Sequence, residues 1–118
     1  PIYYIQYAHA RITKILGDLK ISDVQKENFD NLNTKNEIAL LTLINTYQDT
    51  IDKAIDQIRP DNITNYLYKL SQVFHSYYAE TKIISSTIKG EKIMLLQCID
   101  KIIINSLSIL NIKPMDRM

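Results

Sequence analysis

The sequence has few of the residues on which several protein classes depend. A single cysteine, Cys98, among 118 residues excludes an intrachain disulfide and a cysteine-rich zinc site, and it suits a reducing cytoplasm. Two glycines are too few for a Gly-rich phosphate-binding loop, and with only three prolines they disfavour β-architectures built on tight turns. Tryptophan is absent and phenylalanine occurs twice, whereas eight tyrosines are present, so most of the aromatic surface carries a hydroxyl group.

The sequence also shows no sign of a membrane-spanning segment or of a secretion signal. No apolar run reaches the roughly 18 residues that a membrane span needs. Polar and charged side chains occur throughout the first twelve residues, so we expect no signal peptide. We therefore expect a cytoplasmic protein that binds no membrane.

Charge and reactive side chains give little guidance. The formal net charge is +1, with lysines scattered among aspartates, and this neither favours nor excludes a nucleic-acid partner. His9 and His75 lie far apart in the sequence, and neither has a metal-binding spacing around it. Cys98 falls in a very apolar segment, where a small buried hydrophobic side chain is a better interpretation than a nucleophile. We expect no catalytic residue and no metal site in this chain.

Apolar residues at helical spacing are what the chain has in abundance. The first predicted helix runs from about residue 3 to residue 19, with one stripe at spacings of three and four: Ile5, Ala8, Ile12, Ile15 and Leu19. Residues 20–34 are polar and rich in asparagine, which predicts a loop.

The second helical region is predicted between Thr34 and Ile58. Thr34 or Asn36 can cap its start, and Glu37 stands three residues after Thr34, which is the spacing of a capping box. The region ends before Pro60, because the residue that precedes a proline is turned away from helical geometry. The pattern leaves open whether it is one long helix or two helices broken near residues 46–48.

Two further helices complete the pattern. Asp61 is a candidate N-cap for the third region, whose broad apolar face consists of Ile63, Tyr66, Leu67, Leu70, Val73, Phe74 and Tyr77. A loop is predicted over about residues 80–89 and the last helix over residues 91–110, where the nearly all-round apolar character indicates a central buried helix. Asn111 can end that helix in the left-handed conformation. The predicted fold class is therefore all-α, a single-domain bundle of four to six helices over residues 1–118.

One edge of the first predicted helix carries a possible binding surface. Tyr4, Tyr7 and Arg11 share a stripe at spacings of three and four, next to the apolar stripe. Two aromatic rings and a guanidinium at the border between core and solvent can stack on unstacked RNA bases, reach base edges and pair with phosphate. The alternative interpretation is that these tyrosines only flank the core with a hydrated hydroxyl group.

Other aromatic and polar positions are less informative. His75, Tyr77 and Tyr78 end the third region beside a predicted loop, where tyrosines can line a base pocket. His9 lies on the other flank of the apolar stripe and is interpreted as a partly buried histidine that forms a local hydrogen bond.

Four segments, in order along the chain, resemble the C-terminal DALR-type anticodon-binding domain of arginyl-tRNA synthetases. Residues 4–12 (Tyr-Ile-Gln-Tyr-Ala-His-Ala-Arg-Ile) are similar to the signature that opens this domain, and the match is specific. Three later segments of the family also have counterparts that resemble them here: residues 65–78, residues 92–107 and the end of the chain, residues 114–118 (Pro-Met-Asp-Arg-Met). The resemblance covers nearly the whole chain and is weakest over residues 20–36.

The resemblance implies a function and assigns residues to it. As in that family, Tyr4, Tyr7 and Arg11 are expected to contact the splayed bases of the tRNA-Arg anticodon loop. Tyr78 is expected to face the central base, and Met118 with its terminal carboxylate is expected to lie near the same loop. Gln6 and His9 belong to the motif, and we expect packing and positioning from them.

The resemblance also implies what the chain does without. The chain is expected to be a monomeric fragment that ends at its natural C-terminus, binds the anticodon stem and loop but no DNA, and holds no cofactor. Aminoacylation with ATP and magnesium is expected from the enzyme's own catalytic domain, which is a second partner.

Two departures from the family pattern are mild. Ser106 stands where the family tends to have glycine, which affects close packing, and Asn111 replaces another glycine while keeping the left-handed option. Two alternatives remain: an anticodon-binding domain of another class I synthetase, and a helical protein-interaction domain, which the near-neutral charge favours slightly.

Overall fold

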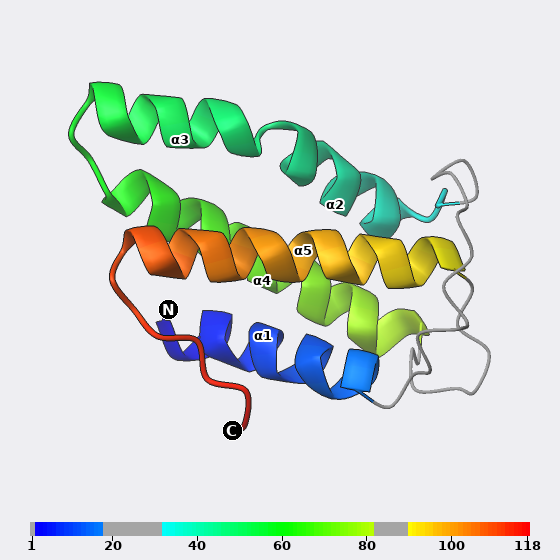
Figure 1. Cartoon of the computed structure of the whole chain (residues 1–118). Coiled ribbons are helices and arrows are strands. Elements are labelled where there is room, and N and C mark those ends of the chain that lie inside the picture. The colour runs from blue at the N-terminus through cyan, green and yellow to red at the C-terminus, as the bar shows by residue number, and fades with distance from the viewer. Residues whose placement is uncertain (1, 18–31, 82–89) are drawn as a thin grey trace.

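The computed structural model describes residues 2–17, 32–81 and 90–118 of the chain (Figure 1). Five helices, and no strand, occur in this part of the chain: α1 (Ile2–Gly17), α2 (Lys35–Asn45), α3 (Tyr47–Asp56), α4 (Asp61–Thr81) and α5 (Gly90–Ile109). The all-α class is confirmed, and five helices fall within the predicted range of four to six.

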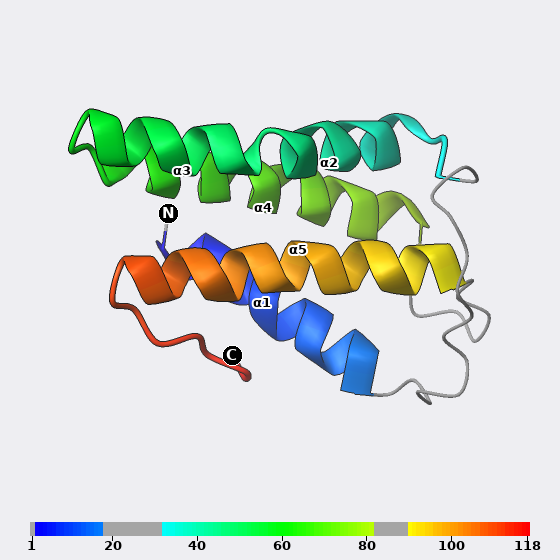
Figure 2. The same cartoon turned by 45° about the horizontal axis from the view of Figure 1, so that its top comes forward.

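The helices are arranged in layers (Figures 1 and 2). α4 and α5 form the middle of the bundle, with α1 on one side and the α2–α3 pair on the other. α4 packs against all four other helices, so the central position predicted for the last helix is shared with α4. α5 also has an outer side on which Ile104 and Ile109 are 41% and 52% exposed.

The core is formed by the apolar stripes that the spacing predicted. Ile5, Ala8, Ile12 and Ile15 of α1 are buried, and Leu19 lies outside the described residues. The predicted face of α4 is also buried, with only Val73 partly exposed. Burying each large aliphatic side chain stabilises the fold by about 1.5–3 kcal/mol, so these stripes determine how the helices pack.

The second helical region is two helices. The predicted capping box is present at its start, since Thr34 caps α2 and the Glu37 side chain accepts from the Thr34 backbone N–H. The break falls at Thr46, whose φ of −94° and ψ of 0° leave helical geometry. The Leu43 carbonyl accepts hydrogen bonds from the Thr46 and Tyr66 hydroxyls, and such competition for a helix carbonyl is a common cause of a kink.

Two helices end with a residue in the left-handed region. Asn111 has a φ of 59°, as predicted, and the N–H of Ile112 reaches back to the Leu107 carbonyl at 2.8 Å. At the end of α3, Ile58 has a φ of 51°, and the N–H of Arg59 reaches back to the Ala54 carbonyl at 2.9 Å. Both are Schellman-type ends, a motif that usually has glycine at the left-handed position.

Several boundaries differ from the predictions by one or two residues. α4 begins at Asp61 itself, so Asp61 belongs to the first helical turn instead of preceding it, and its carboxylate pairs with Arg59 at 3.0 Å. The loops predicted over residues 20–34 and 80–89 lie mostly outside the described residues. No helix in the described ranges combines the length and the apolarity needed to cross a membrane.

Candidate nucleic-acid interface

The guanidinium of Arg11 lies between two tyrosine rings. Its central carbon is 4.4 Å from the ring centroid of Tyr7, one turn earlier on α1, and 4.3 Å from that of Tyr78 near the end of α4. One terminal nitrogen also donates to the Tyr7 hydroxyl at 3.1 Å. Cation–π contacts at such partly exposed positions are worth about 0.5–1 kcal/mol each, so the three side chains support one another's orientation.

His75 connects this group to Tyr4. The other terminal nitrogen of Arg11 lies 3.1 Å from Nδ1 of His75, and because arginine only donates, Nδ1 must accept. The proton is then on Nε2, which faces the Tyr4 carbonyl at 3.4 Å. Burial lowers the pKa of His75, and the Arg11 charge lowers it further against the opposing effect of the Tyr4 carbonyl. His75 therefore acts as a neutral link between α4 and α1.

Tyr4 lies beside this group with about a third of its surface exposed. Its ring centroid is 4.5 Å from that of His75 and 5.6 Å from that of Tyr68, a further exposed ring on α4. The aromatic surface therefore continues along the α1–α4 edge beyond Arg11, and it includes Tyr68, which the sequence pattern did not single out.

A depression with a volume of about 620 Å³ lies in front of the Arg11 group. Nine residues from three parts of the chain line it: Tyr7, Ala10, Arg11, Thr13, Lys14, Tyr78, Asp116, Arg117 and Met118. Three of these side chains are cationic and one is anionic, so cationic groups predominate among the charged side chains that line the depression. Aromatic rings beside cationic groups are the combination that a single-stranded nucleic acid requires.

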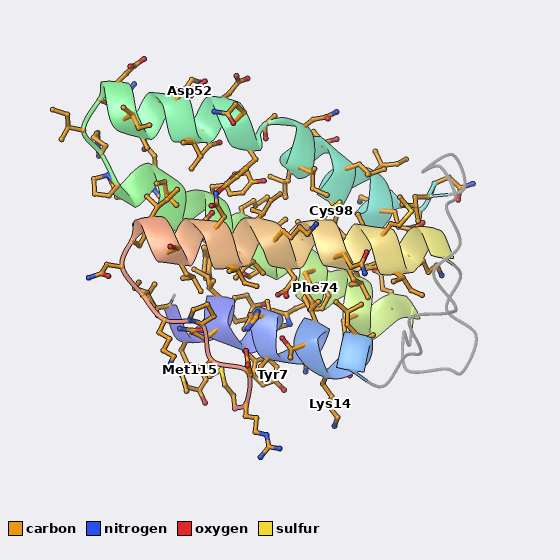
Figure 3. All side chains as sticks on the ribbon, viewed as in Figure 1. Tyr7, Lys14, Asp52, Phe74, Cys98 and Met115 are labelled. Atoms are coloured by element: carbon orange, nitrogen blue, oxygen red, sulfur yellow. The ribbon has the colours of Figure 1, made fainter. Side chains whose placement is uncertain are left out.

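The terminal segment, residues 112–118, lies along α1 and forms one wall of the depression. Figure 3 shows it beside α1, with Met115 near Tyr7. Gln6, which is buried, donates from Nε2 to the Lys113 carbonyl at 2.9 Å and accepts at Oε1 from the Met115 N–H at 2.8 Å. One side chain of α1 thus pairs with the backbone of the terminal segment in both directions.

His9 forms a second connection to the terminal segment, and its partners are distant in sequence. It is 3% exposed, with Nδ1 2.6 Å from Asp100 of α5 and Nε2 2.8 Å from Asp116. His9 is more buried than expected, and although the Thr13 hydroxyl one turn later on α1 lies 3.5 Å from Nε2, its shorter contacts are with residues distant in the sequence. Burial alone lowers the pKa of His9, but hydrogen bonds to Asp116 and Asp100 and their charges raise it above the ordinary value. An imidazolium that donates from both nitrogens fits this geometry.

The structure brings most of the predicted binding residues together. Tyr7, Arg11, Tyr78 and Met118 line one depression, and Tyr4 lies next to it through His75. Tyr77, considered together with Tyr78, does not line it, because its side chain is fully buried and donates to Glu37 at 2.7 Å.

Sequence reasoning missed several residues of the site. Lys14 could have been found, since it follows Arg11 by three positions on the same helical stripe. Arg117 and the Asp100–His9–Asp116 contact carried no such signal, because they depend on how the terminal segment and α5 pack against α1.

Other reactive groups are not assembled into a site. Cys98 is only partly buried, contrary to the expectation of a buried side chain. Within residues 2–17, 32–81 and 90–118, no three His, Cys, Asp or Glu side chains are placed to hold a metal ion.

Comparison with known proteins identifies the family to which this geometry corresponds. The family model of the DALR anticodon binding domain matches residues 5–118. The arginine–tRNA ligase of Ureaplasma parvum serovar 3 is 37% identical over 123 residues, which cover all of this chain and 22% of that protein. That of Lawsonia intracellularis is 39% identical over 120 residues, with 95% of this chain and 22% of the relative covered.

A solved structure agrees with the sequence relatives. The crystal structure from Campylobacter jejuni that is assigned as an arginyl-tRNA synthetase superposes with a TM-score of 0.88 at 29% identity, over all of this chain and 26% of that one. The chain is thus homologous to the C-terminal region of arginine–tRNA ligases, and it spans about 22% of the length of the curated relatives.

Proposed function

The chain belongs to the family of DALR anticodon-binding domains, and from this membership we propose that it binds the anticodon stem and loop of tRNA-Arg within a cytoplasmic arginine–tRNA ligase. One observation carries the choice of site: Arg11 lies between the rings of Tyr7 and Tyr78, and all three line the depression that ends at Met118.

The proposed mode of binding follows from the chemistry of these side chains. Bases of the anticodon loop stack on the ring surface that Tyr7 and Tyr78 present to the depression, and stacking of this kind is worth about 1–3 kcal/mol per base. Tyr4 offers a further ring along the same edge. Arg11 stacks on a base or pairs with phosphate, and the terminal Met118 contacts the same loop.

Catalysis is assigned to another part of the enzyme. Relatives that are more than four times longer provide the remaining domains, and ATP and magnesium would be bound there. Two glycines in the whole chain do not supply a Gly-rich phosphate loop.

The direct test is a titration of the chain with transcribed tRNA-Arg and with the same tRNA carrying a substituted anticodon. The substituted tRNA should bind more weakly. Tyr7→Ala and Arg11→Ala should weaken binding of tRNA-Arg by about 5- to 150-fold, the range expected for the loss of one stacking contact. Deletion of Met118 should weaken binding in the same direction.

A matched control comes from the same helix. Tyr3 is 74% exposed and does not line the depression, so Tyr3→Ala should leave the affinity unchanged. Equal affinity for the two tRNAs would refute anticodon recognition. Loss of helical circular dichroism in Tyr7→Ala or Arg11→Ala would instead show that the stripe is part of the core.

A further inference from the structure

We infer that Gln6 and His9 are positioning residues for anticodon binding: they fasten the terminal segment to α1 and thereby place Arg117 and Met118 at the depression. This inference rests on the proposed function above. Gln6 and His9 do not line the depression themselves, whereas three of its nine lining residues belong to the terminal segment. Their effect on RNA must therefore pass through that segment.

Gln6 sets the register of the terminal segment along α1. Its amide donates to the carbonyl of Lys113 and accepts from the N–H of Met115, two residues further on. Both bonds require a group that donates and accepts, so a glutamate at this position loses the donor and leaves the Lys113 carbonyl unpaired. Because Gln6 is 4% exposed, water cannot easily replace either bond.

His9 holds the segment closer to its end. The charged groups that face its ring are Asp100 from α5 and Asp116 from the terminal segment, and within α1 the Thr13 hydroxyl lies 3.5 Å from Nε2. Only the protonated ring donates to both carboxylates. Of the two, Asp100 is 15% exposed and has the shorter contact, whereas Asp116 is 74% exposed. A neutral His9 therefore keeps Asp100 and releases Asp116.

The anchor at Asp116 is adjacent to the residues that it positions. Arg117 and Met118 follow directly in the chain, and both line the depression with Tyr7 and Tyr78. Once Asp116 is free, these two side chains must be ordered again when RNA binds, and that ordering reduces affinity. The connection thus links the protonation of a buried histidine to the shape of the proposed RNA site.

The test combines a structural measurement with an affinity measurement. Methyl-labelled methionine gives three NMR signals: Met115 and Met118 report on the terminal segment, and Met94 of α5 is an internal reference. In Gln6→Glu and Asp116→Ala, the first two signals should move toward their positions in an unfolded chain while Met94 stays. Affinity for a transcribed tRNA-Arg anticodon stem-loop should fall by about three- to tenfold.

Asp116→Ala is the decisive variant, because Gln6 is buried and its replacement can destabilise the fold. Asp116→Glu keeps the carboxylate, so it should retain most of the affinity of the unchanged chain. Asp56→Ala, on the exposed side of α3, should change neither the methionine signals nor the affinity. A pH titration adds a second measurement. If His9 only packed against its neighbours, its protonation would not affect the terminal segment or the affinity for RNA. In the unchanged chain the Met118 signal and the affinity should both change as pH rises above 6.5, and Asp116→Ala should lack this step.

The outcomes separate this inference from the proposed function. An unmoved Met118 signal in Asp116→Ala overturns the inference, and so does a detached segment with unchanged affinity; in both cases the effect of Tyr7→Ala still supports the RNA site. If Tyr7→Ala leaves the affinity unchanged, the proposed function fails, and the positioning role for RNA fails with it.

Discussion

At the scale of single residues, the side chains at the edge of α1 belong to the core and to the surface at once. Tyr4 and Tyr7 are 37% and 36% exposed, and each packs one side of its ring against His75. The Arg11 guanidinium also lies over the Tyr7 ring, 4.4 Å from its centroid, and Tyr68 lies beside Tyr4, so only part of each ring is open to solvent. The packed side fixes the direction of the ring in the absence of a ligand, so little side-chain entropy is left to lose when a base stacks on it.

Ser71 on α4 provides a test of polar burial. Its side chain is fully buried, and its hydroxyl oxygen has no hydrogen-bond partner among the described residues. A buried hydroxyl without a partner costs free energy, and alanine is also the better helix former. Ser71→Ala should therefore raise the free energy of unfolding by about 1 kcal/mol, as measured by urea denaturation.

Ser106 on α5 is the matched control for this prediction. It is equally buried, but its hydroxyl lies 2.8 Å from the hydroxyl of Tyr47. Ser106→Ala should lower the free energy of unfolding by about 1 kcal/mol in the same assay. Changes of equal sign in both variants would contradict the explanation from hydrogen bonding.

At the scale of helices, the two left-handed ends differ in the residue that adopts the strained conformation. Ile58 is β-branched, is 87% exposed and has a φ of 51°, whereas Asn111 tolerates its φ of 59°. Ile58→Gly should raise the free energy of unfolding by about 0.5–1 kcal/mol, which is the relieved strain less the added entropy of the unfolded chain. Asn111→Gly should change it less. Thermal unfolding of the two variants measures both changes in stability. An equal change in Ile58→Gly and Asn111→Gly would argue against strain at Ile58.

The contact between Glu37 and Tyr77 joins α2 to α4. Burial opposes ionisation of Glu37, but hydrogen bonds from Tyr77 and Thr34 and the charge of Lys92 bring its pKa below the ordinary value. Burial and the neighbouring carboxylate raise the pKa of Tyr77, so its hydroxyl stays protonated and donates. Tyr77→Phe should lower the free energy of unfolding at pH 7 by about 1.5–3 kcal/mol, the range for a hydrogen bond to a charged group.

The same contact predicts the direction of an acid effect. Because the pKa of Glu37 is lower in the folded state, its stabilisation is complete above the unfolded value of 4.5 and is lost as pH falls through the folded pKa. The loss of stability between pH 6 and pH 3 should therefore be smaller in Glu37→Gln than in the unchanged chain. Parallel pH profiles of the two would contradict this assignment.

The parts of the fold that depend on neighbours in sequence could be predicted from the sequence. The capping box at Thr34, the left-handed Asn111 and the apolar stripe of α1 all follow from spacings of one to four residues. The break at Thr46 could only be left as an alternative, because it involves a hydroxyl of Tyr66 from another helix. The partners of His9 lie 91 and 107 residues away, which no local pattern indicates. The binding residues were assigned through family resemblance, since spacing alone also allowed tyrosines that merely flank the core.

At the scale of the whole molecule, the near-neutral charge limits how strongly salt should affect RNA binding. The depression has three cationic side chains, Arg11, Lys14 and Arg117. If each contacts one phosphate of a single-stranded loop, the logarithm of the association constant should fall with the logarithm of salt concentration at a slope of about −2. Lys14→Ala should reduce this slope by about 0.7, and Lys53→Ala on α3 should not. A slope near zero would exclude phosphate contacts by these groups.

The position of α1 against α4 and α5 has a consequence for synthesis of the chain on the ribosome. α1 emerges before α4 and α5, the helices that pack against it. The separation in sequence is large: Arg11 of α1 and its contact His75 of α4 are 64 residues apart. At about 5–20 residues per second, the apolar stripe of α1 waits about 3–13 s before α4 can cover it. During that interval α2 and α3, which follow each other directly in the chain, can already form and contact each other. The terminal segment follows α5 in the chain, so its contacts with α1, which complete the surface proposed to read the anticodon, become available only after α5 has emerged.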